Sequence, residues 1–221
     1  MIDLSKVQKR TTADIAKRIV QDIPDGAHVN LGIGQPMTIS NYLPSDKEIL
    51  LHSENGLLGM GPLAKDHEID EELVNAGKQP VTMLPGASLC HHADSFVMIR
   101  GGHIDICVLG AFQVSVKGDI ANWRTGDPKA IPAVGGAMDL ALGAKKLFVM
   151  MEHLTKSGES KLVKECTYPL TALAAVDCIY TDLATIAVTP QGLVALDWVE
   201  GMSFEDLQAL SGVPMIQGSV R

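Results

Sequence analysis

Glu54 is the residue of this sequence with the clearest potential for chemistry. It comes three residues after the apolar run 49–51, which is typical of a buried strand, and Asn55 and Gly56 follow it. Ligands of α/β proteins bind beyond the carboxyl ends of parallel strands, and a glycine there lets a substrate approach the backbone closely. The alternative is a structural carboxylate at a strand-to-loop corner that accepts hydrogen bonds from the amides of Asn55 and Gly56.

Two glycines at the end of an earlier strand are candidates for ligand binding. Residues 29–33 alternate as in a strand, Gly32 and Gly34 bracket its exit, and Pro36 is suited to opening a short helix. Met37 stands where a dinucleotide fingerprint requires its third glycine, which argues against a Rossmann site. The turn could instead cradle the phosphates or pantetheine of another ligand, or it could serve only as a tight strand-to-helix turn.

A second glycine pair, Gly135-Gly136, leads into a predicted helix around residues 137–140. Backbone N–H groups at such a position lack intrahelical partners and can point at an oxygen anion. The alternative is close packing of a loop on a strand. Gly135 and Gly136 are therefore candidate donors to an oxyanion.

Other reactive side chains point to chemistry less strongly. Cys90, His91, His92 and Asp94 are crowded into one loop without the separated second pair of a tetrahedral site, so no metal is expected, and Asp94 or Ser95 is expected to cap a helix instead. Glu152 and His153 are adjacent at a strand end and should face opposite ways. Trp123 could line a cleft or pack under a long loop. The four cysteines are scattered, which favours reduced thiols, at positions 90, 107, 166 and 178.

Composition narrows the class of protein. The 221 residues are enough for one large domain with a core, spanning residues 1–221 with a loose tail from about Gln217. The formal charge of -8 and the absence of a basic cluster argue against nucleic acid or an anionic membrane as partner. The sequence has no run of 18 uncharged apolar residues and no signal-peptide pattern at its start, so we expect a soluble, cytoplasmic protein.

The apolar periodicity predicts an α/β protein with an open, mainly parallel sheet and flanking helices. Helices are expected from Thr11 or Thr12 to Ile23 and from Ser203 to Gly212, each with a recognisable cap. A further helix is expected near 174–180. Strands are expected at 29–33, 48–52, 81–84, 104–114, 147–151, 162–167, 184–188 and 193–199.

Several segments, read in order, resemble one family, the B subunits of the 3-oxoacid CoA-transferases. They are NLGIG (30–34), HSENGLLGMGP (52–62), LVNAG (73–77), FVMIRGGHIDICVLGAFQV (96–114), ANW (121–123), GGAMDL (135–140) and MEH (151–153). HHADSF, LGAFQ and RTGDPKAIPAVGGAMDL are most similar to the 3-oxoadipate group of that family. Gln35 and Ala172 depart from the family pattern, which puts the shape of the acyl pocket in question.

The resemblance implies the CoA-transferase fold and covalent catalysis by a glutamate that corresponds to Glu54. It implies a glycine amide near Gly135 and Gly136 as oxyanion donor, and it makes Gly32, Gly34, Asn55 and Gly56 candidates for contact with CoA or substrate.

It also implies a partner, the CoA-transferase A subunit, in a heterodimer or α2β2 heterotetramer. No cofactor or metal is implied, because the CoA thioester is itself a substrate. Two alternatives stay open. One is a sugar-phosphate isomerase or deaminase on a related fold, with Glu54 as base, and the other is a non-catalytic protein that only binds a ligand.

Overall fold

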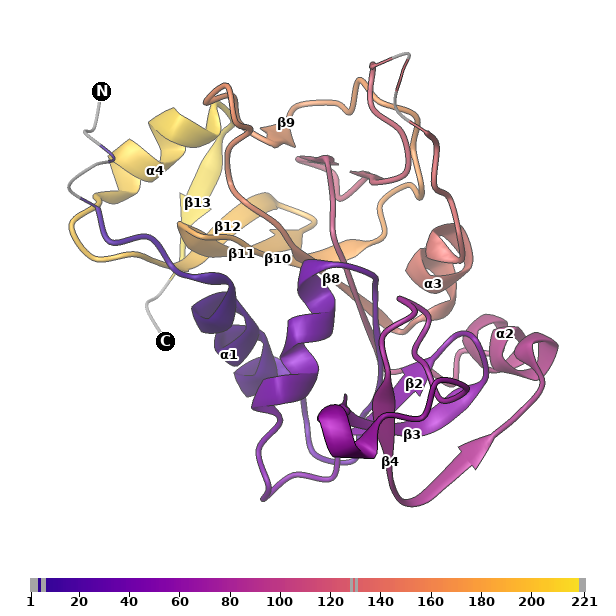
Figure 1. Cartoon of the computed structure of the whole chain (residues 1–221). Helices are drawn as coiled ribbons and strands as arrows, with labels where there is room; N and C mark the ends of the chain where they lie inside the picture. Colours follow the sequence, from indigo (N-terminus) through magenta and orange to yellow (C-terminus); the bar gives the residue numbers. More distant parts are fainter. Residues whose placement is uncertain (1–3, 5–6, 128, 130, 219–221) are drawn as a thin grey trace.

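The computed structural model describes residue 4, residues 7–127, residue 129 and residues 131–218. Its centre is a ten-stranded sheet with the order β13-β12-β11-β10-β8-β5-β1-β2-β3-β4 (Figure 1). The five central strands are parallel to one another: β1 (His28–Leu31), β2 (Leu50–Ser53), β5 (Ile106–Leu109), β8 (Lys146–Met150) and β10 (Val176–Tyr180). The sequence prediction of an α/β fold with a mainly parallel sheet is confirmed.

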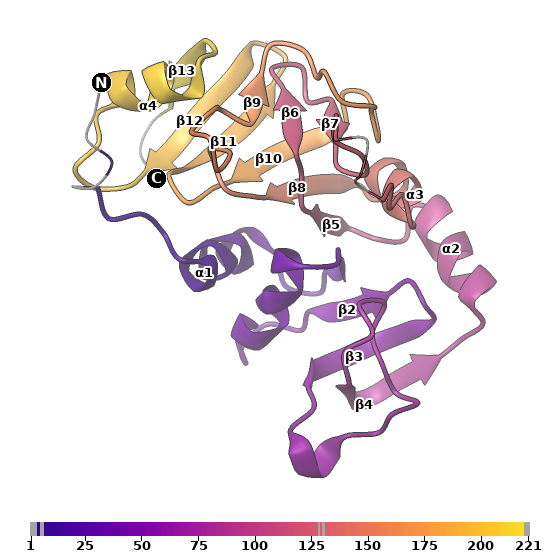
Figure 2. The same cartoon turned by 45° about the horizontal axis from the view of Figure 1, so that its top comes forward.

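Antiparallel strands extend both ends of this parallel core. On one side lie β3 (Leu57–Leu63) and the edge strand β4 (Val81–Leu89), and on the other lie β11 (Ala184–Thr189) and β12 (Gly192–Trp198), with β13 (Met215–Gln217) parallel to β12. A separate small sheet has the order β7-β6-β9 (Figure 2). Its strands are β6 (Gln113–Ser115), β7 (Ile120–Ala121) and β9 (Leu162–Val163).

Helices pack on both faces of the large sheet. Helix α1 (Thr12–Asp22) and the 3₁₀ segment η2 (Gln35–Tyr42) contact each other on one face. Helices α2 (His92–Arg100) and α3 (Ala137–Gly143) contact each other on the opposite face (Figure 2). Helix α4 (Phe204–Ser211) follows β12 in the chain, and η3 (Asp66–Glu68) is a short surface turn. None of the described helices is long and apolar enough to cross a membrane.

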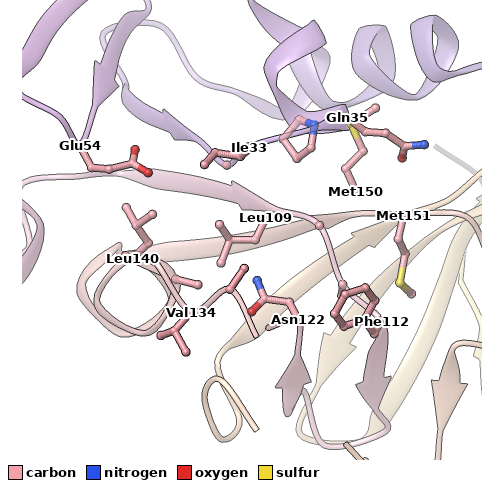
Figure 3. Close-up of a pocket in the computed structure, with 18 of the residues that line it drawn as sticks. Ile33, Gln35, Glu54, Leu109, Phe112, Asn122, Val134, Leu140, Met150 and Met151 are labelled. Carbon is pink, nitrogen blue, oxygen red and sulfur yellow. The ribbon is translucent and has the colours of Figure 1, made fainter. Parts of the chain in front are cut away.

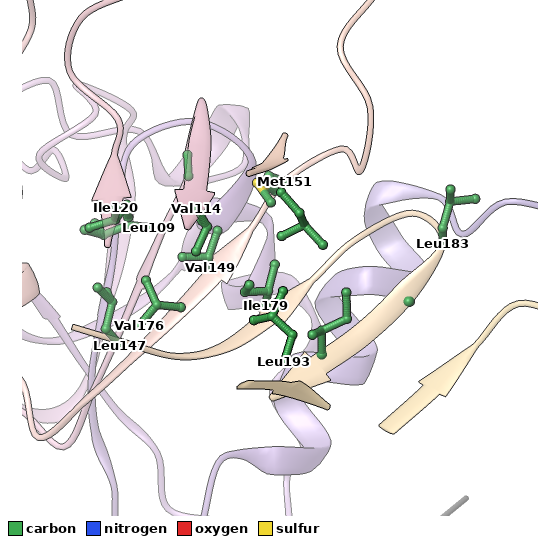
Figure 4. Close-up of a cluster of buried hydrophobic side chains, with 14 of the residues drawn as sticks. Leu109, Val114, Ile120, Leu147, Val149, Met151, Val176, Ile179, Leu183 and Leu193 are labelled. Carbon is green, nitrogen blue, oxygen red and sulfur yellow. The ribbon is translucent and has the colours of Figure 1, made fainter. Parts of the chain in front are cut away.

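The alternation of side chains along the strands divides the core into two clusters. In β5, Ile106 and Val108 face α1 and η2, whereas Cys107 and Leu109 join the cluster on the other face. Phe148 belongs to the first cluster and its neighbour Val149 to the second. Figure 4 shows the second cluster, which fills the space between the large sheet and the small one. This two-sided burial is why the central strands read as continuous apolar runs.

The predicted caps of the first and last helices, α1 and α4, are confirmed. The Thr11 side chain accepts a hydrogen bond from the Asp14 amide, and Asp14 reaches back to Thr11 in a capping box. Ser203 caps α4 in the same way, and Gly212 ends that helix in the left-handed conformation.

Two long predictions are wrong because tertiary pairing overrides the local pattern. The expected strand 104–114 breaks after Leu109, since the chain leaves the large sheet there and residues 113–115 pair with β7 and β9 instead. The expected helix at 174–180 is strand β10. Ala174 has a φ of +46°, which no helix accepts, and the residues after it pair with β8 and β11.

Smaller predictions are also corrected. The strand expected at 162–167 keeps only Leu162–Val163, and the one expected at 81–84 continues to Leu89 through Pro85, which an edge strand tolerates. Helix α2 begins earlier than expected. Its cap is His91, because Nδ1 of the His91 ring accepts a hydrogen bond from the Ala93 amide. Gln217, where the tail was expected to begin, lies in β13, and residues 219–221 lie outside the described residues.

His153 joins the end of β8 to two other elements. Its ring nitrogens lie 3.1 Å from Thr181 Oγ1 and 2.9 Å from Ser211 Oγ, and its backbone amide donates to Asp182. The side chain is fully buried, and this burial lowers the pKa of His153 to about 4. The ring is therefore neutral at physiological pH.

We predict that acid weakens the fold through His153. The unfolded chain takes up the proton near pH 6.5 and the folded chain near pH 4, so the unfolded state binds more protons between these values and stability falls as pH falls. Going from pH 7 to pH 5 should cost roughly 2 kcal/mol through this one group. Urea unfolding at both pH values measures it. His153→Gln, which cannot titrate, should show a smaller pH dependence, and an unchanged dependence would contradict the assignment.

Candidate active site

A pocket of about 460 Å³ opens at the carboxyl ends of β1, β5 and β8 (Figure 3). After β1, the next strand of the sheet is its neighbour β2 on one side. β5 lies on the other side of β1, and the next strand of the sheet after it is β8, which lies farther on that side. The chain therefore leaves β1 and β5 in opposite directions. Such a switch point is where open α/β sheets bind ligands. The described residues that line the pocket are Gly32, Ile33, Gln35, Pro36, Glu54, Leu109–Phe112, Asn122, Ala133–Ala137, Leu140, Met150–Glu152 and Lys161.

Glu54 lies at one end of this pocket, half-buried, immediately after β2 (Figure 3). Its Oε2 accepts a hydrogen bond of 3.1 Å from Nδ2 of Asn30 on the neighbouring strand β1. Asn30 is directly opposite His52 in the parallel register, and its side chain is fully buried. The sheet register therefore brings a buried amide donor to the Glu54 carboxylate.

The orientation of the Asn30 amide follows from its partners. An ionised carboxylate only accepts hydrogen bonds, so the atom that faces Glu54 must be the Nδ2 donor. The same nitrogen is 3.1 Å from Nδ1 of His52 and 3.2 Å from the His52 carbonyl oxygen. On the other side, the Cys107 thiol donates weakly to Asn30 Oδ1 at 3.8 Å, and burial raises the pKa of that thiol, with the Glu54 charge adding to the effect.

His52 supports Asn30 from behind. Burial lowers the pKa of His52 to about 4, with a smaller contribution from His28, so the ring is neutral at physiological pH. Its Nε2 is 2.8 Å from Oγ of Ser95 on helix α2, and the Ser95 side chain is fully buried. The strand end that carries Glu54 is thereby tied to both β1 and α2.

Asn55 and Gly56 are close to Glu54 in sequence but do not line the pocket of this chain. The Asn55 side chain donates to the Val74 carbonyl oxygen, and the Gly56 amide donates to the Ser53 carbonyl oxygen. Gly56 has a φ of +115°, and a Cβ there would lie 2.3 Å from the Cys90 carbonyl oxygen. Both residues shape the loop that follows Glu54, and their predicted contact with substrate stays a prediction.

Gly32 and Gly34 also have identifiable structural roles. A Cβ on Gly32 would lie 2.8 Å from the Leu109 side chain and 3.0 Å from the Val108 carbonyl oxygen, so glycine lets β1 and β5 approach at the pocket floor. Gly34 adopts a φ of +96° and precedes η2. Gly32 lines the pocket and Gly34 does not.

Gly135 and Gly136 border the same pocket as Glu54, as an oxyanion role requires. Gly136 is the cap residue of α3, and neither amide donates a hydrogen bond to another described residue. Open space surrounds Gly135, while a Cβ on Gly136 would lie 3.0 Å from the Phe96 ring. Their role as donors stays a prediction that this placement allows.

Polar side chains gather at the other end of the pocket. Gln35 donates to Oε1 of Glu152 at 3.4 Å, and Lys161 also lines the wall. Burial raises the pKa of Glu152, with the Asp182 charge adding to it, and burial lowers the pKa of Lys161. Of the two residues that depart from the family pattern, Gln35 therefore lines the pocket, whereas Ala172 is buried in the core.

The remaining candidates lie away from this chemistry. Among the described residues, no cluster of three or more His, Cys, Asp or Glu side chains could hold a metal ion, and all four cysteines are free. Trp123 donates through its ring nitrogen to the Leu170 carbonyl oxygen and does not line the pocket. Pro128 and Ala130, in the segment RTGDPKAIPAVGGAMDL, lie outside the described residues.

Sequence reasoning missed the residues that support Glu54 from the interior. In the sequence, Asn30 stands out only as part of the segment 30–34, and Ser95 only as a possible helix cap. The available signal was polarity inside an apolar strand, because a fully buried Asn or His has to find hydrogen-bonding partners. Lys161 gives no such signal, since it ends the charged segment 156–161, which is typical of a surface turn.

Together these groups suit covalent chemistry on an acyl group. Glu54 presents a carboxylate that is held by an amide donor, and the pocket adds backbone N–H groups near the start of α3 that have no acceptor among the described residues. His52, whose imidazole makes its hydrogen bonds to Asn30 and Ser95, does not line the pocket. The arrangement favours a carboxylate that attacks directly over one that acts with a histidine base.

This chain is similar to known proteins over most of its length. Residues 12–205 match the Coenzyme A transferase family. The chain is 62% identical to the B subunit of the 3-oxoadipate CoA-transferase of Pseudomonas putida, over 95% of this chain and 98% of that protein. It is 46% identical to the B subunit of the succinyl-CoA:3-ketoacid coenzyme A transferase of Helicobacter pylori strain 26695, over 88% of this chain and 93% of the other.

Solved structures show the same fold at low sequence identity. The acyl-CoA transferase YdiF of Escherichia coli O157:H7 superposes with a TM-score of 0.75 at 16% identity. That match covers 95% of this chain and 42% of the longer YdiF chain. The fold, the family match and the close relatives agree, and this chain belongs to the coenzyme A transferase family.

Proposed function

We propose that this chain is the nucleophile-bearing half of a two-component CoA-transferase, with Glu54 as the residue that carries CoA between two carboxylic acids. The observation that supports this most is the hydrogen bond from buried Asn30 to Glu54 at the edge of the switch-point pocket. It keeps a carboxylate in place where an acyl thioester can reach it.

The chemistry divides a slow step into faster ones. A Glu54 oxygen attacks the thioester carbonyl, the C–S bond breaks, and a mixed anhydride and CoA thiolate form. The thiolate then attacks the Glu54 carbonyl of the anhydride, which releases the first acid as a carboxylate and leaves a glutamyl-CoA thioester. The acceptor carboxylate attacks this thioester to give a new anhydride and thiolate, and the thiolate takes the acceptor acyl group and restores Glu54.

Each of these steps passes through a tetrahedral oxyanion that needs hydrogen-bond donors. The amides of Gly135 and Gly136 are our candidates, because they border the pocket and have no described acceptor of their own. Loss of one well-aimed donor typically raises such a barrier by about 3 to 4 kcal/mol. A second donor is expected from the partner chain.

The preferred substrates follow from the relatives' names. We infer succinyl-CoA as donor and 3-oxoadipate as acceptor, since the 62% identical relative belongs to a 3-oxoadipate CoA-transferase and the succinyl-CoA:3-ketoacid relative is 46% identical. Acetoacetate is the next candidate acceptor. Gln35, whose amide faces Glu152 across the pocket wall, is a residue on which this choice could depend.

The proposed partner is the A subunit of a CoA-transferase, in a heterodimer or an α2β2 heterotetramer. Both relatives are named as B subunits, and YdiF accommodates this fold within a longer single chain. Large apolar side chains at the pocket are exposed in the isolated chain, including Ile33 at 65% and Phe112 at 40%. A second polypeptide that covers this side would bury them and exclude water from the reacting atoms.

We predict that Glu54 becomes covalently modified. The complex with the A subunit is mixed with succinyl-CoA without acceptor and quenched with hydroxylamine, and the tryptic peptide Glu48 to Lys65 is weighed. A hydroxamate on Glu54 is the expected product, and Glu54→Gln should abolish both the adduct and turnover. An unmodified peptide in a complex that binds CoA would favour the isomerase or deaminase alternative, in which Glu54 acts only as a base.

We also predict that the purified chain alone has no turnover, because half of the site is missing. Steady-state assays of this chain, with the A subunit present or omitted, measure this. Full activity of the chain alone would contradict the two-component assignment. A complex in which Glu54→Gln leaves activity intact would instead indicate a non-catalytic role for this chain.

A further inference from the structure

Four side chains from three elements form a hydrogen-bonded chain that ends at Glu54. Ser95 Oγ on α2 is 2.8 Å from His52 Nε2, His52 Nδ1 is 3.1 Å from Asn30 Nδ2, and Asn30 Nδ2 is 3.1 Å from Glu54 Oε2. Ser95 and Asn30 are fully buried and His52 is 2% exposed. The three supporting side chains are therefore shielded from the water that could otherwise replace their partners.

The direction of each hydrogen bond in this chain is fixed. Asn30 donates through Nδ2 because Glu54 only accepts, so the His52 Nδ1 that faces the same nitrogen must carry a lone pair. A neutral imidazole has one N–H, which then lies on Nε2 and donates to Ser95 Oγ. The Ser95 hydroxyl proton is free to point toward the Ser53 carbonyl oxygen, 3.5 Å away.

In this order the His52 imidazole adds to the acceptors that orient the Asn30 amide. If the amide turned by 180°, Oδ1 would face three acceptors that would repel it: the Glu54 carboxylate, the His52 Nδ1 lone pair and the His52 carbonyl oxygen. On the opposite side, the weak Cys107 thiol donor is the one hydrogen-bonding partner of Oδ1 among the described residues. The His52 lone pair thus adds to the penalty that the His52 carbonyl oxygen places on the orientation in which Glu54 loses its donor.

We propose that His52 is a positioning residue for the nucleophile: held by Ser95 in the Nε2–H tautomer, it fixes the Asn30 amide in the orientation that donates to Glu54. The inference rests on the proposed role of Glu54 as nucleophile. His52 does not border the pocket, so it acts on the reaction only through Asn30.

The effect expected is on rate and not on substrate affinity. A Glu54 carboxylate that samples other orientations still leaves the pocket intact for binding, but it attacks the thioester carbonyl less often. Misplacement of a reacting group by about 1 Å can reduce a rate by about 10²-fold. A histidine with a purely structural role would change stability without such a selective loss of kcat.

The test compares two substitutions of His52 in the complex with the A subunit. His52→Leu keeps much of the volume but removes the acceptor, and kcat should fall by roughly 10² while KM stays within about threefold. His52→Gln can accept from Asn30 through Oε1 and donate to Ser95 through Nε2, so it should recover most of the lost kcat. Equal kcat for His52→Leu and the unsubstituted complex would overturn the proposal, as would a loss that His52→Gln does not reverse.

His153→Leu is the matched control. His153 is also a fully buried neutral histidine beside a serine and a threonine hydroxyl, but it has no hydrogen bond to the Glu54 chain. It should lower the unfolding temperature while the kcat of the folded complex stays unchanged. A kcat loss equal to that of His52→Leu would show that burial of a histidine, and not its contact with Asn30, matters.

Ser95→Ala keeps the test decisive if His52→Leu fails to fold. Without the Ser95 acceptor the imidazole proton can move to Nδ1, which turns His52 from an acceptor toward Asn30 into a donor. Ser95→Ala should therefore also lower kcat. When it is combined with His52→Leu, which already lacks the imidazole, kcat should fall little further than in His52→Leu alone. An unaffected kcat in Ser95→Ala would contradict the proposed role of Ser95 in holding His52 in this tautomer.

The two proposals can fail separately. Hydroxylamine trapping on the unsubstituted complex first establishes whether Glu54 carries an acyl or CoA adduct. If it does and His52→Leu forms the adduct as fast, only the positioning role of His52 is refuted. If the unsubstituted complex forms no adduct, the proposed function itself fails, whatever His52 does.

Discussion

The hydrogen bond between Asn30 and Glu54 is the interaction on which the candidate site depends most. It joins the ends of two neighbouring parallel strands, and one of its partners is fully buried. A hydrogen bond to a charged group is worth roughly 1.5 to 3 kcal/mol, and a buried amide that loses its acceptor has a comparable penalty. Both partners therefore favour the same geometry, which leaves the carboxylate ordered before any substrate arrives.

The sheet explains why these two residues meet. In the parallel register of β1 and β2, Asn30 stands opposite His52, so the residue two positions beyond His52 lies at the mouth of the sheet. β5 and β8 end at the same edge, and their connections, together with Gly32 and the glycines before α3, border the pocket of about 460 Å³. Helix α2 closes the back of this arrangement through Ser95.

The sequence predicted the features that local patterns encode and missed those that pairing decides. The caps at Thr11 and Ser203, the core strands and the carboxylate that follows β2 can all be read from neighbouring residues. The end of β5 at Leu109 and the strand at 176–180 depend on which segments lie beside them. In the same way, no spacing rule connects Asn30, His52 and Ser95, because only the sheet register and the packing of α2 bring them together.

The central claim is that an oxygen atom of the Glu54 carboxylate becomes covalently bonded to the substrate acyl group. Transfer of an oxygen isotope tests this claim most directly. The complex is allowed to turn over with succinyl-CoA and an acceptor acid whose carboxylate carries oxygen-18, and the tryptic peptide Glu48 to Lys65 is then fragmented in a mass spectrometer. Passage through a mixed anhydride leaves heavy oxygen in the Glu54 carboxylate, so we expect the label there and not on Glu48. Formation of the acceptor's CoA ester with no label on Glu54 would contradict the account.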